Sequence, residues 1–283
     1  ANPNDPYMQH LKQNDLAQIH VEDYHKRKQS ADSATWCSPL PREYCTDDFC
    51  GQSALRILDD FPEEGPWFLQ VNFPGPHDPF DAPQELLSRY QGLDFEQPVA
   101  GESGPPRDHQ AFRRQFAAMI EGIDEWVGWI AAHVEKRWGL ENTVIVYTSD
   151  HGEMLGDHGR WAKQRPEDPS CRVPLVAAGP GIVQGKRSNA LVELSDLAAL
   201  FVDLAGRAVP EAWDARSFLP LLTGEADRHR DVQVSMLHNW KMITDGHWKL
   251  VDEADMQRLY DLQSDPHELT DVAGQHPAEV ARL

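Results

Sequence analysis

Acidic and imidazole side chains recur in one stretch of this chain, TSDHGEMLGDHGRWAK. It contains the pair Asp150 and His151, a second pair Asp157 and His158, and Lys163 shortly after them. A carboxylate oxygen beside an imidazole nitrogen suits a divalent ion of hard or borderline character. A lysine next to such an ion can hold an oxyanion and stabilise charge that develops on a leaving oxygen. The spacing therefore indicates a metal and oxyanion site.

A structural interpretation stays open for the same residues. Asp150 can cap the turn that follows it, His151 can hydrogen-bond locally, and a lone lysine often lies on the surface with its stem on apolar groups. His77 weakens this interpretation, because it follows another apolar run, WFLQVNF, that ends at Pro-Gly-Pro. In an open α/β sheet, ligands bind at the carboxyl ends of the strands. We expect His77, Asp150 and His151 to lie there. Gly152 is expected to let the backbone bend there.

The elements that must position these residues have the pattern of an α/β fold. Apolar residues recur every three or four positions over residues 110–138, which predicts a long helix that ends at Gly139. The run NTVIVYTS at residues 142–149 shows no alternation, as expected of a parallel strand covered on both faces. A helix followed by such a strand is half of an α/β repeat.

Shorter elements complete the prediction. Helices are expected over residues 46–60 and 195–205, and strands over residues 67–73 and 174–178. Thr46 with Asp47 is expected to cap the first of these helices, and Ser195 the second. Short mixed segments after about residue 220 have hairpin spacing around Asp245-Gly246. We therefore predict an α/β domain over residues 1–219 and a C-terminal α+β subdomain with a small antiparallel sheet over residues 220–283.

Composition limits the class of protein. The 283 residues are 40% apolar, which is ordinary for a folded chain with one large core or two smaller ones. A net charge of −20 argues against nucleic acid or an anionic membrane as partner. No apolar run approaches the roughly 20 residues that span a bilayer. The chain opens without a signal peptide and without methionine, so we expect the true start to lie elsewhere.

Longer stretches of the sequence resemble one family. SDHGEMLGDHGRWAK followed by CRVPLVAAGPGI resembles the second signature region of the type I sulfatases, in the alkaline phosphatase superfamily. Further matches follow the family's order: PLPREYCTDDFCGQSALRIL, WFLQVNFPGPHDPF, ENTVIVYTSDHGE, HWKLVDE and RLYDLQSDPHELTDV. They cover nearly all of the chain from about Pro39, and matches in order are more specific than one short motif. The resemblance implies an alkaline-phosphatase-like α/β fold, with a central, mostly parallel sheet between helices.

The resemblance also implies roles for individual residues. In that family a divalent ion, usually calcium, with manganese or magnesium as alternatives, is held partly by an Asp-Asn or Asp-His pair after a late strand. Asp150 and His151 match that pair. His77 matches the histidine that binds the sulfate or protonates the leaving oxygen, and Lys163 matches the lysine that holds sulfate and bridging oxygens. His158 belongs to the loop structure or contacts substrate.

The family nucleophile is not found. It is a cysteine or serine in the pattern C/S-x-P-x-R, oxidised to formylglycine. The run from Cys37 to Arg42 reads CSPLPR, where the arginine comes one residue late, so we do not expect Cys37 to be the nucleophile. The two early aspartates of the family site are also not found. The sequence therefore indicates the C-terminal part of a longer sulfatase, with the formylglycine supplied by a missing N-terminal region.

The predicted function is hydrolysis of a sulfate monoester, either a small molecule or a carbohydrate. A phosphonate monoester or phosphodiester hydrolase is the first alternative, because those enzymes resemble sulfatases across the same motifs. A non-catalytic relative that binds a sulfated ligand is the second.

The remaining expectations concern single features of the chain. The loop at residues 91–107 is expected to carry specificity but shows no recognisable code. Arg172 is expected to tie its loop to the core through a carboxylate. We expect free thiols and a soluble protein of the bacterial cytoplasm or periplasm, and predict no oligomeric state.

Overall fold

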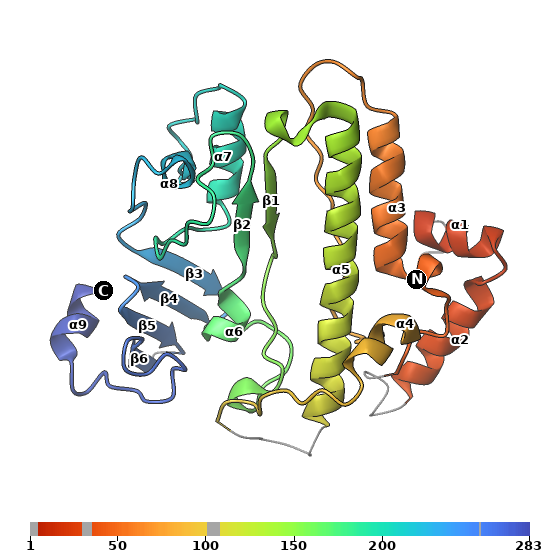
Figure 1. Cartoon of the computed structure of the whole chain (residues 1–283). Helices are drawn as coiled ribbons and strands as arrows, with labels where there is room; N and C mark the ends of the chain where they lie inside the picture. The colour runs from red at the N-terminus through yellow and green to blue at the C-terminus, as the bar shows by residue number, and fades with distance from the viewer. Residues whose placement is uncertain (1–4, 30–35, 101–107, 255) are drawn as a thin grey trace. The chain divides into compact units, whose positions relative to one another are not determined.

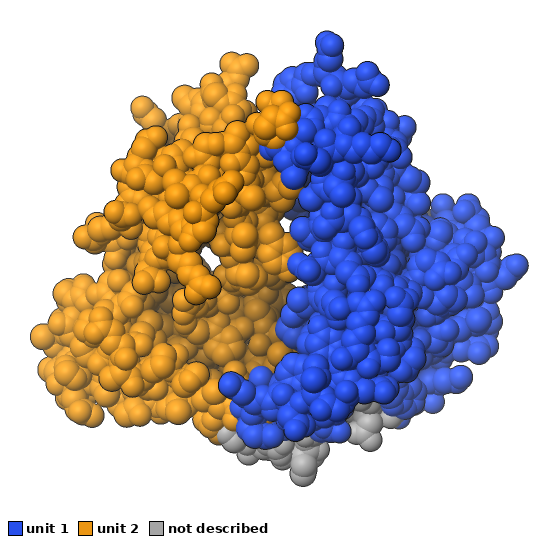
Figure 2. Space-filling view, viewed as in Figure 1, with its two compact units in different colours: residues 1–97, 105–140 blue, residues 98–104, 141–283 orange. Residues whose placement is uncertain are grey.

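The structure, a computed structural model, describes residues 5–29, 36–100, 108–254 and 256–283. The chain forms two compact units (Figure 2), the first from residues 1–97 and 105–140 and the second from residues 98–104 and 141–283. These units are defined by contacts within the chain, whereas the predicted boundary after residue 219 separates a catalytic domain from a C-terminal subdomain. That boundary therefore stays a prediction. Of the loop at 91–107, residues 101–107 lie outside the described residues.

The first unit is helical (Figure 1). Its described elements are α1 (Pro6–Gln13), α2 (Ala17–Lys28), η2 (Arg42–Tyr44), α3 (Thr46–Asp59), α4 (Gln84–Leu87), η3 (Ser88–Tyr90) and α5 (His109–Trp138). α3 and α5 lie side by side, and Gly51 permits the close approach, because a Cβ there would lie 2.1 Å from a ring carbon of Trp126. α5 confirms the predicted long helix, and Gly139 ends it with φ 79°. No described helix is long and apolar enough to cross a membrane.

Two local predictions in this unit are wrong. Residues 67–73 form no strand, although their side chains alternate between half-buried and exposed. A strand requires a hydrogen-bonded neighbour, and the local pattern does not show whether one is present. At the start of α3 the N-cap is Cys45, and its side chain makes no capping hydrogen bond. Asp47 lies inside the first turn and bonds to a distant backbone group instead, as described below.

The second unit contains two small sheets. Its elements are η4 (Leu140–Asn142, at the junction), β1 (Ile145–Thr148), η5 (Asp157–Gly159), α6 (Asp168–Cys171), β2 (Leu175–Ala178), α7 (Asp196–Leu204), α8 (Leu219–Thr223), β3 (Gln233–Leu237), β4 (Trp240–Thr244), β5 (Trp248–Glu253), β6 (Met256–Asp261) and α9 (Pro277–Arg282). β1 pairs with β2, and β3 to β6 form a four-stranded antiparallel sheet in chain order (Figure 1). The predicted helix at 195–205 and the hairpin around Asp245-Gly246 are confirmed. Ser195 is the N-cap residue of α7, but its side chain makes no capping hydrogen bond, so the predicted cap is wrong in that respect.

The pairing of β1 differs from the expected parallel arrangement. β1 and β2 coincide with the predicted strands, but they run antiparallel, with Ile145 opposite Ala178. β1 is half-buried rather than covered on both faces. An apolar run reveals that a strand is present, whereas the direction of pairing depends on which segment becomes its neighbour. The local sequence carries no information about that neighbour.

The four-stranded sheet packs one face into a core that includes α6. The buried residues of this cluster are Trp240, Met242, Val251 and Tyr260. Cys171, the last residue of α6, packs against them. Burial of these side chains stabilises the contact, at roughly 25 cal/mol per Å² of apolar surface removed from water. The sheet and α6 therefore form one packed body next to the candidate site.

Candidate functional site

Asp150 and His151 follow directly after β1, as predicted. The backbone N–H of His151 donates to Oδ1 of Asp150 at 3.0 Å, and its Nε2 lies 3.7 Å from Oδ2 of Asp150. Nδ1 of His151 lies 2.8 Å from the carbonyl oxygen of Gly152. Because a carbonyl oxygen only accepts hydrogen bonds, Nδ1 carries a proton and the neutral ring has its lone pair on Nε2. The pair thus presents a carboxylate and an imidazole nitrogen to the same region.

Gly152 brings this turn against α6. Its N–H donates to the carbonyl oxygen of Ser170 at 2.8 Å, and a Cβ at Gly152 would lie 2.0 Å from the carbonyl oxygen of Pro169. Its φ is not in the left-handed region. A left-handed conformation is therefore not the reason for this glycine, and the bend expected here stays a prediction. The residue is small because α6 approaches it closely.

Lys163 follows a loop that Glu153 closes. Oε1 of Glu153 accepts a hydrogen bond from the backbone N–H of Ala162 at 2.6 Å. The backbone N–H of Met154, whose side chain is fully buried, donates to the carbonyl oxygen of Ala162 at 2.9 Å. The loop therefore begins at the Asp-His turn and returns to it one residue before the half-buried Lys163. Sequence analysis missed Glu153, and the signal was its place directly after the first Asp-His-Gly triplet.

The second Asp-His-Gly triplet lies within this loop. Oδ1 of Asp157 accepts from the backbone N–H of Val99 at 3.0 Å, and the backbone N–H of His158 donates to the carbonyl oxygen of Val99 at 2.8 Å. His158 has φ 54°, in the left-handed region. These contacts support the structural interpretation of Asp157, since its carboxylate fixes a neighbouring segment. A substrate contact by His158 stays a prediction.

His77 lies in the first unit, whereas Asp150, His151, His158 and Lys163 lie in the second. Nδ1 of His77 lies 2.8 Å from the carbonyl oxygen and 3.0 Å from Oδ1 of Asp78. The carbonyl contact again assigns the proton to Nδ1. The side chain of His77 is 47% exposed.

The loop that carries His77 is hydrogen-bonded to the half-buried carboxylate of Asp47. Oδ1 of Asp47 accepts from the backbone N–H of Gly75 at 2.8 Å. A Cβ at Gly75 would lie 2.2 Å from Oδ2 of Asp47, so only glycine permits this approach. Burial raises the pKa of Asp47 to about 6, the Gly75 N–H opposes that rise, and the nearby Asp48 adds to it. Asp47 was not among the predicted site residues.

The residues present fit part of a metal site. Among residues 5–29, 36–100, 108–254 and 256–283, no group of three or more His, Cys, Asp or Glu side chains is placed to hold a metal ion. Calcium takes six to eight ligands, mostly oxygen, and Asp150 with His151 supplies two donor groups. The tautomer of His151 suits metal binding, because ligating histidines usually donate their other N–H to a carbonyl or carboxylate. The pair fits as part of a site, not as a complete one.

The four cysteines are free thiols, as predicted. Cys37 donates to Oε1 of Gln84 at 3.2 Å, and burial raises the pKa of its thiol. Burial also raises the pKa of Cys50, that of Cys45 to about 12 and that of Cys171 to about 11. A thiolate is the reactive form of cysteine, and burial disfavours it at all four positions.

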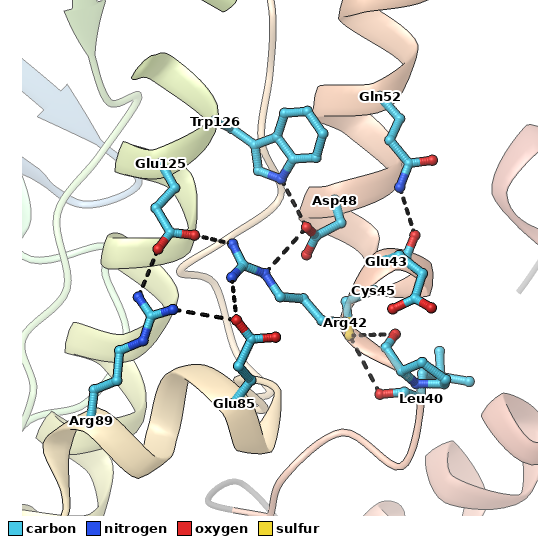
Figure 3. A network of polar contacts seen from close by, with 11 residues as sticks. Leu40, Arg42, Glu43, Cys45, Asp48, Gln52, Glu85, Arg89, Glu125 and Trp126 are labelled. Atoms are coloured by element: carbon cyan, nitrogen blue, oxygen red, sulfur yellow. Dashed lines mark hydrogen bonds and ion pairs between the residues drawn. The ribbon is translucent and has the colours of Figure 1, made fainter. Parts of the chain in front are cut away.

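Arg42, at the end of the CSPLPR run, belongs to an ion network (Figure 3). Its guanidinium lies 3.0 Å from Glu85 and 3.5 Å from Asp48, and it also pairs with Glu125. Nε1 of Trp126 donates to Asp48 at 3.0 Å. The network joins the segment before α3 to α3, α4 and α5. Arg42 therefore has a structural role. This agrees with our expectation that the CSPLPR run is not the nucleophile motif and that Cys37 is not the nucleophile.

Arg172 does not anchor its loop as expected. Its side chain is 80% exposed, and Nη1 lies 3.7 Å from Oδ2 of Asp168 one helical turn earlier. An exposed pair at that distance contributes little to stability. Asp168 is instead held by the side chain of Lys249, on β5 of the C-terminal sheet.

The fold is similar to those of solved sulfatase-like hydrolases. A phosphonate monoester hydrolase from Silicibacter pomeroyi matches with a TM-score of 0.78 and 25% identity, over 89% of this chain and 62% of that one. A protein solved in complex with its substrate D-glucosamine-2-N,6-O-disulfate matches with a TM-score of 0.75 and 20% identity, over 84% and 67%. These likenesses confirm the predicted alkaline-phosphatase-like fold, with mixed helix and sheet.

Comparisons of the sequence agree with the alkaline-phosphatase-like fold. Residues 8–207 match the family described as Sulfatase, and residues 156–282 match "N-sulphoglucosamine sulphohydrolase, C-terminal". The chain belongs to the sulfatase family. It is 33% identical over 250 residues to a choline-sulfatase of Rhizobium meliloti (strain 1021), which covers 77% of this chain and 48% of the relative. It is 32% identical over 189 residues to arylsulfatase K of Xenopus laevis, over 60% and 35%. The chain thus spans about half or less of the length of these relatives.

Proposed function

We propose that the protein containing this chain hydrolyses a sulfate ester, with Asp150 and His151 as ligands of a divalent ion and Lys163 as a sulfate-binding group. The observation that carries the proposal is the closed loop, in which Glu153 and Met154 bond to Ala162 next to Lys163. It ties a cationic side chain to the turn that presents the carboxylate and the imidazole. Sulfatase family membership supports the same chemistry.

Charge explains why such a site needs cations. The chain carries a net charge of −20, which repels an anionic sulfate ester. When bound, a divalent ion, which we propose to be calcium with manganese or magnesium as alternatives, polarises the sulfate oxygens and offsets that repulsion. Lys163 supplies a compact positive charge that can stabilise the oxygen on which charge develops as the ester bond breaks.

His77 is proposed as the group that binds sulfate or protonates the leaving oxygen. Asp78 fixes the ring through Nδ1, which makes Nε2 the atom that exchanges a proton. The proposed nucleophile is a formylglycine, as the family resemblance implies. Cys37, Cys45, Cys50 and Cys171 do not lie in the pattern C/S-x-P-x-R, so we look for it in another part of the full reading frame.

The proposed substrate is a small organic or carbohydrate sulfate ester. The relatives named choline-sulfatase and N-acetylglucosamine-6-O-sulfatase, the latter from Bacteroides thetaiotaomicron and 30% identical over 190 residues, support both kinds. A second candidate is phosphonate monoester hydrolysis, which the Silicibacter pomeroyi structure favours. The two differ in the charge and the geometry of the group attacked, and substrate profiling separates them.

The test uses protein made from the full reading frame, with its formylglycine content measured by peptide mass mapping. We expect sulfate release from choline sulfate, an aryl sulfate or a glucosamine sulfate to exceed hydrolysis of a phenyl phosphonate monoester. Lys163→Ala should lower kcat/KM roughly 100- to 1,000-fold, as expected for removal of one group that stabilises an oxyanion. Lys241→Ala, on an exposed position of β4, is the matched control and should leave kcat/KM unchanged.

Each alternative has its own signature in the same assay. Faster phosphonate than sulfate hydrolysis would favour the second candidate. Binding of sulfated ligands without turnover, in protein that lacks formylglycine, would favour the non-catalytic relative. Normal activity of Lys163→Ala would contradict the role assigned to Lys163.

A further inference from the structure

A buried lysine lies beside the loop that carries Lys163. Lys249 is the second residue of β5, and its side chain is 1% exposed. Its Nζ lies 2.9 Å from Oδ1 of Asp168 and 2.6 Å from Oε1 of Glu268. The contact to Asp168 is a hydrogen bond, and the contact to Glu268 is a close ion pair. A cation enclosed in the protein thus joins two carboxylates.

Glu268 holds the same segment through the backbone. Its Oε2 accepts from the backbone N–H of Asp168 at 2.7 Å. Lys249 binds the Asp168 side chain and Glu268 binds its main chain, so the two residues together fix both parts of the first residue of α6. We call Lys249, Glu268 and Asp168 the lysine clamp.

Two further contacts join the sheet to the residues just after Lys163. Nε1 of the buried Trp240 donates to the carbonyl oxygen of Gln164 at 3.0 Å. Nη1 of Arg165 lies 3.5 Å from Oε1 of Glu253 on β5. The segment from Lys163 to α6 is therefore attached to β4 and β5 at several successive residues.

The other side of α6 is hydrogen-bonded to Gly152, the residue after the Asp150–His151 pair. The carbonyl oxygen of Ser170 accepts from the N–H of Gly152, directly after His151. α6 is thus bonded to the C-terminal sheet through Asp168 and to the Asp-His turn through Ser170. A displacement of α6 would move the turn and the Lys163 segment together.

A charged group is an expensive way to stabilise such a contact. Burial acts to lower the pKa of Lys249, but the Glu268 and Asp168 carboxylates outweigh it and raise the pKa, so the ammonium keeps its charge. Replacing a buried ion pair by apolar side chains of similar volume is often neutral or stabilising. A buried pair at this place is better explained by the geometry that it imposes than by net stability.

We propose that Lys249 is a positioning residue that, with Glu268, holds the Lys163 segment and the Asp150–His151 turn in place for sulfate binding. The inference rests on the proposed function, because it concerns how the sulfate-binding group is held. Lys249 acts through Asp168 and α6 and does not itself contact substrate.

The main test is the double variant Lys249→Met/Glu268→Met in protein made from the full reading frame. It replaces the buried pair by apolar side chains, so we expect a folded protein with a Tm equal to or above that of the unchanged protein. We expect kcat/KM for the best sulfate ester to fall 10- to 100-fold, mostly through KM, because small displacements of binding groups cost about that much. Lys241→Met, an exposed lysine on the neighbouring strand, is the matched control.

A double-mutant cycle separates positioning from general damage. If Lys249 acts through Lys163, the same double substitution should change kcat/KM much less in a Lys163→Ala background. A full, additive effect in that background would overturn positioning of the Lys163 segment, and an unchanged KM in the folded double variant would overturn the proposal as a whole.

A second readout does not depend on activity. The amides of Gly152, Met154 and Asp168 are hydrogen-bonded in or next to the clamped segment, so their hydrogen exchange should speed up in the double variant while amides of α7 stay protected. Unchanged exchange at these amides would overturn the positioning role. If the unchanged protein hydrolyses no sulfate ester, the proposed function fails, whereas exchange still decides whether the clamp holds the segment.

Discussion

Asp47, half-buried in the first unit, and Asp196, fully buried in the second, both lie in the first turn of a helix, but their pKa values shift in opposite directions. Burial raises the pKa of Asp47 to about 6, and the hydrogen bond from Gly75 opposes that rise only in part. Asp196 is 0% exposed, and burial acts to raise its pKa too. Hydrogen bonds from Arg230 and from the backbone N–H groups of Arg216 and Glu193 nevertheless lower it to about 2.

The difference shows that burial alone does not fix the charge state of a carboxylate. Asp196 receives Nε of Arg230 at 2.8 Å and Nε2 of His229 at 3.1 Å, so its negative charge is matched by donors. Asp47 has a like-charged neighbour in Asp48 and receives a backbone N–H from Gly75. Ionised Asp196 therefore stabilises its unit, whereas ionised Asp47 destabilises the unit that holds His77.

The largest effect is expected from Asp196→Asn. Removing the carboxylate takes the nearest counter-charge from the guanidinium of Arg230, whose side chain is 10% exposed, and leaves Glu193 at 3.5 Å, so the free energy of unfolding should fall by about 3 kcal/mol. Urea denaturation at pH 7 measures it, with Asp231→Asn as control because Asp231 pairs with Arg228 on the surface. A loss no greater than that of the control would show that Asp196 is not the centre of a charged network.

Acid should act on the same group. The folded pKa of Asp196 is about 2, below the ordinary value of 3.8. Its contribution to stability is therefore fully present above about pH 4 and is lost as the pH falls through about 2.

A smaller effect of opposite sign is expected at Asp47. Its pKa is raised from 3.8 to about 6, so the folded state binds the proton more tightly and its stability falls as the pH rises from about 4 to about 6. The shift corresponds to at most about 3 kcal/mol, at 1.36 kcal/mol per pKa unit. Asp47→Asn keeps an oxygen for the Gly75 N–H, and should raise the free energy of unfolding at pH 7 and remove this pH dependence. A destabilised Asp47→Asn protein at pH 7 would contradict the comparison.

The smallest effect is expected when one donor to Asp196 is removed. His229→Phe loses a single hydrogen bond but retains a ring where His229 packs against Phe218, so it should cost about 1 kcal/mol. Arg230 and the backbone donors remain in place. Denaturation of His229→Phe beside Asp196→Asn sharpens the comparison, because equal losses would mean that the donors act as one unit rather than as a redundant set.

Local sequence patterns predicted part of this structure well. The 3.6-residue apolar period over α5 and the glycine at its end specify the helix without reference to distant residues. The apolar run before Asp150 likewise predicted a strand, confirmed as β1, with the Asp-His pair at its end. The strand expected at residues 67–73 failed because a strand needs a partner, and the antiparallel direction of β1 and β2 was missed for the same reason.

Contacts between distant residues were not predictable in the same way. Glu153 follows the first Asp-His-Gly triplet, but its hydrogen bond to Ala162 appears only when the loop closes, and the role of Asp47 appears only when Gly75 approaches it. Lys249 lies more than eighty positions from Lys163 and resembles any lysine in an amphipathic strand. Nothing near it in the sequence indicates that its side chain is buried between two carboxylates.

The sequence by itself determined the family, the long helix, the strand that ends at Asp150 and the types of donor that follow it. These features depend on residue type and on spacing over a few turns or strand positions, which the chain carries locally. The tertiary structure alone decided the pairing of β1 with β2, the closure of the Lys163 loop and the opposite charge behaviour of Asp47 and Asp196. Each of these depends on which distant donors and charges enclose a group, because burial and electrostatic neighbours are set only once the chain has packed.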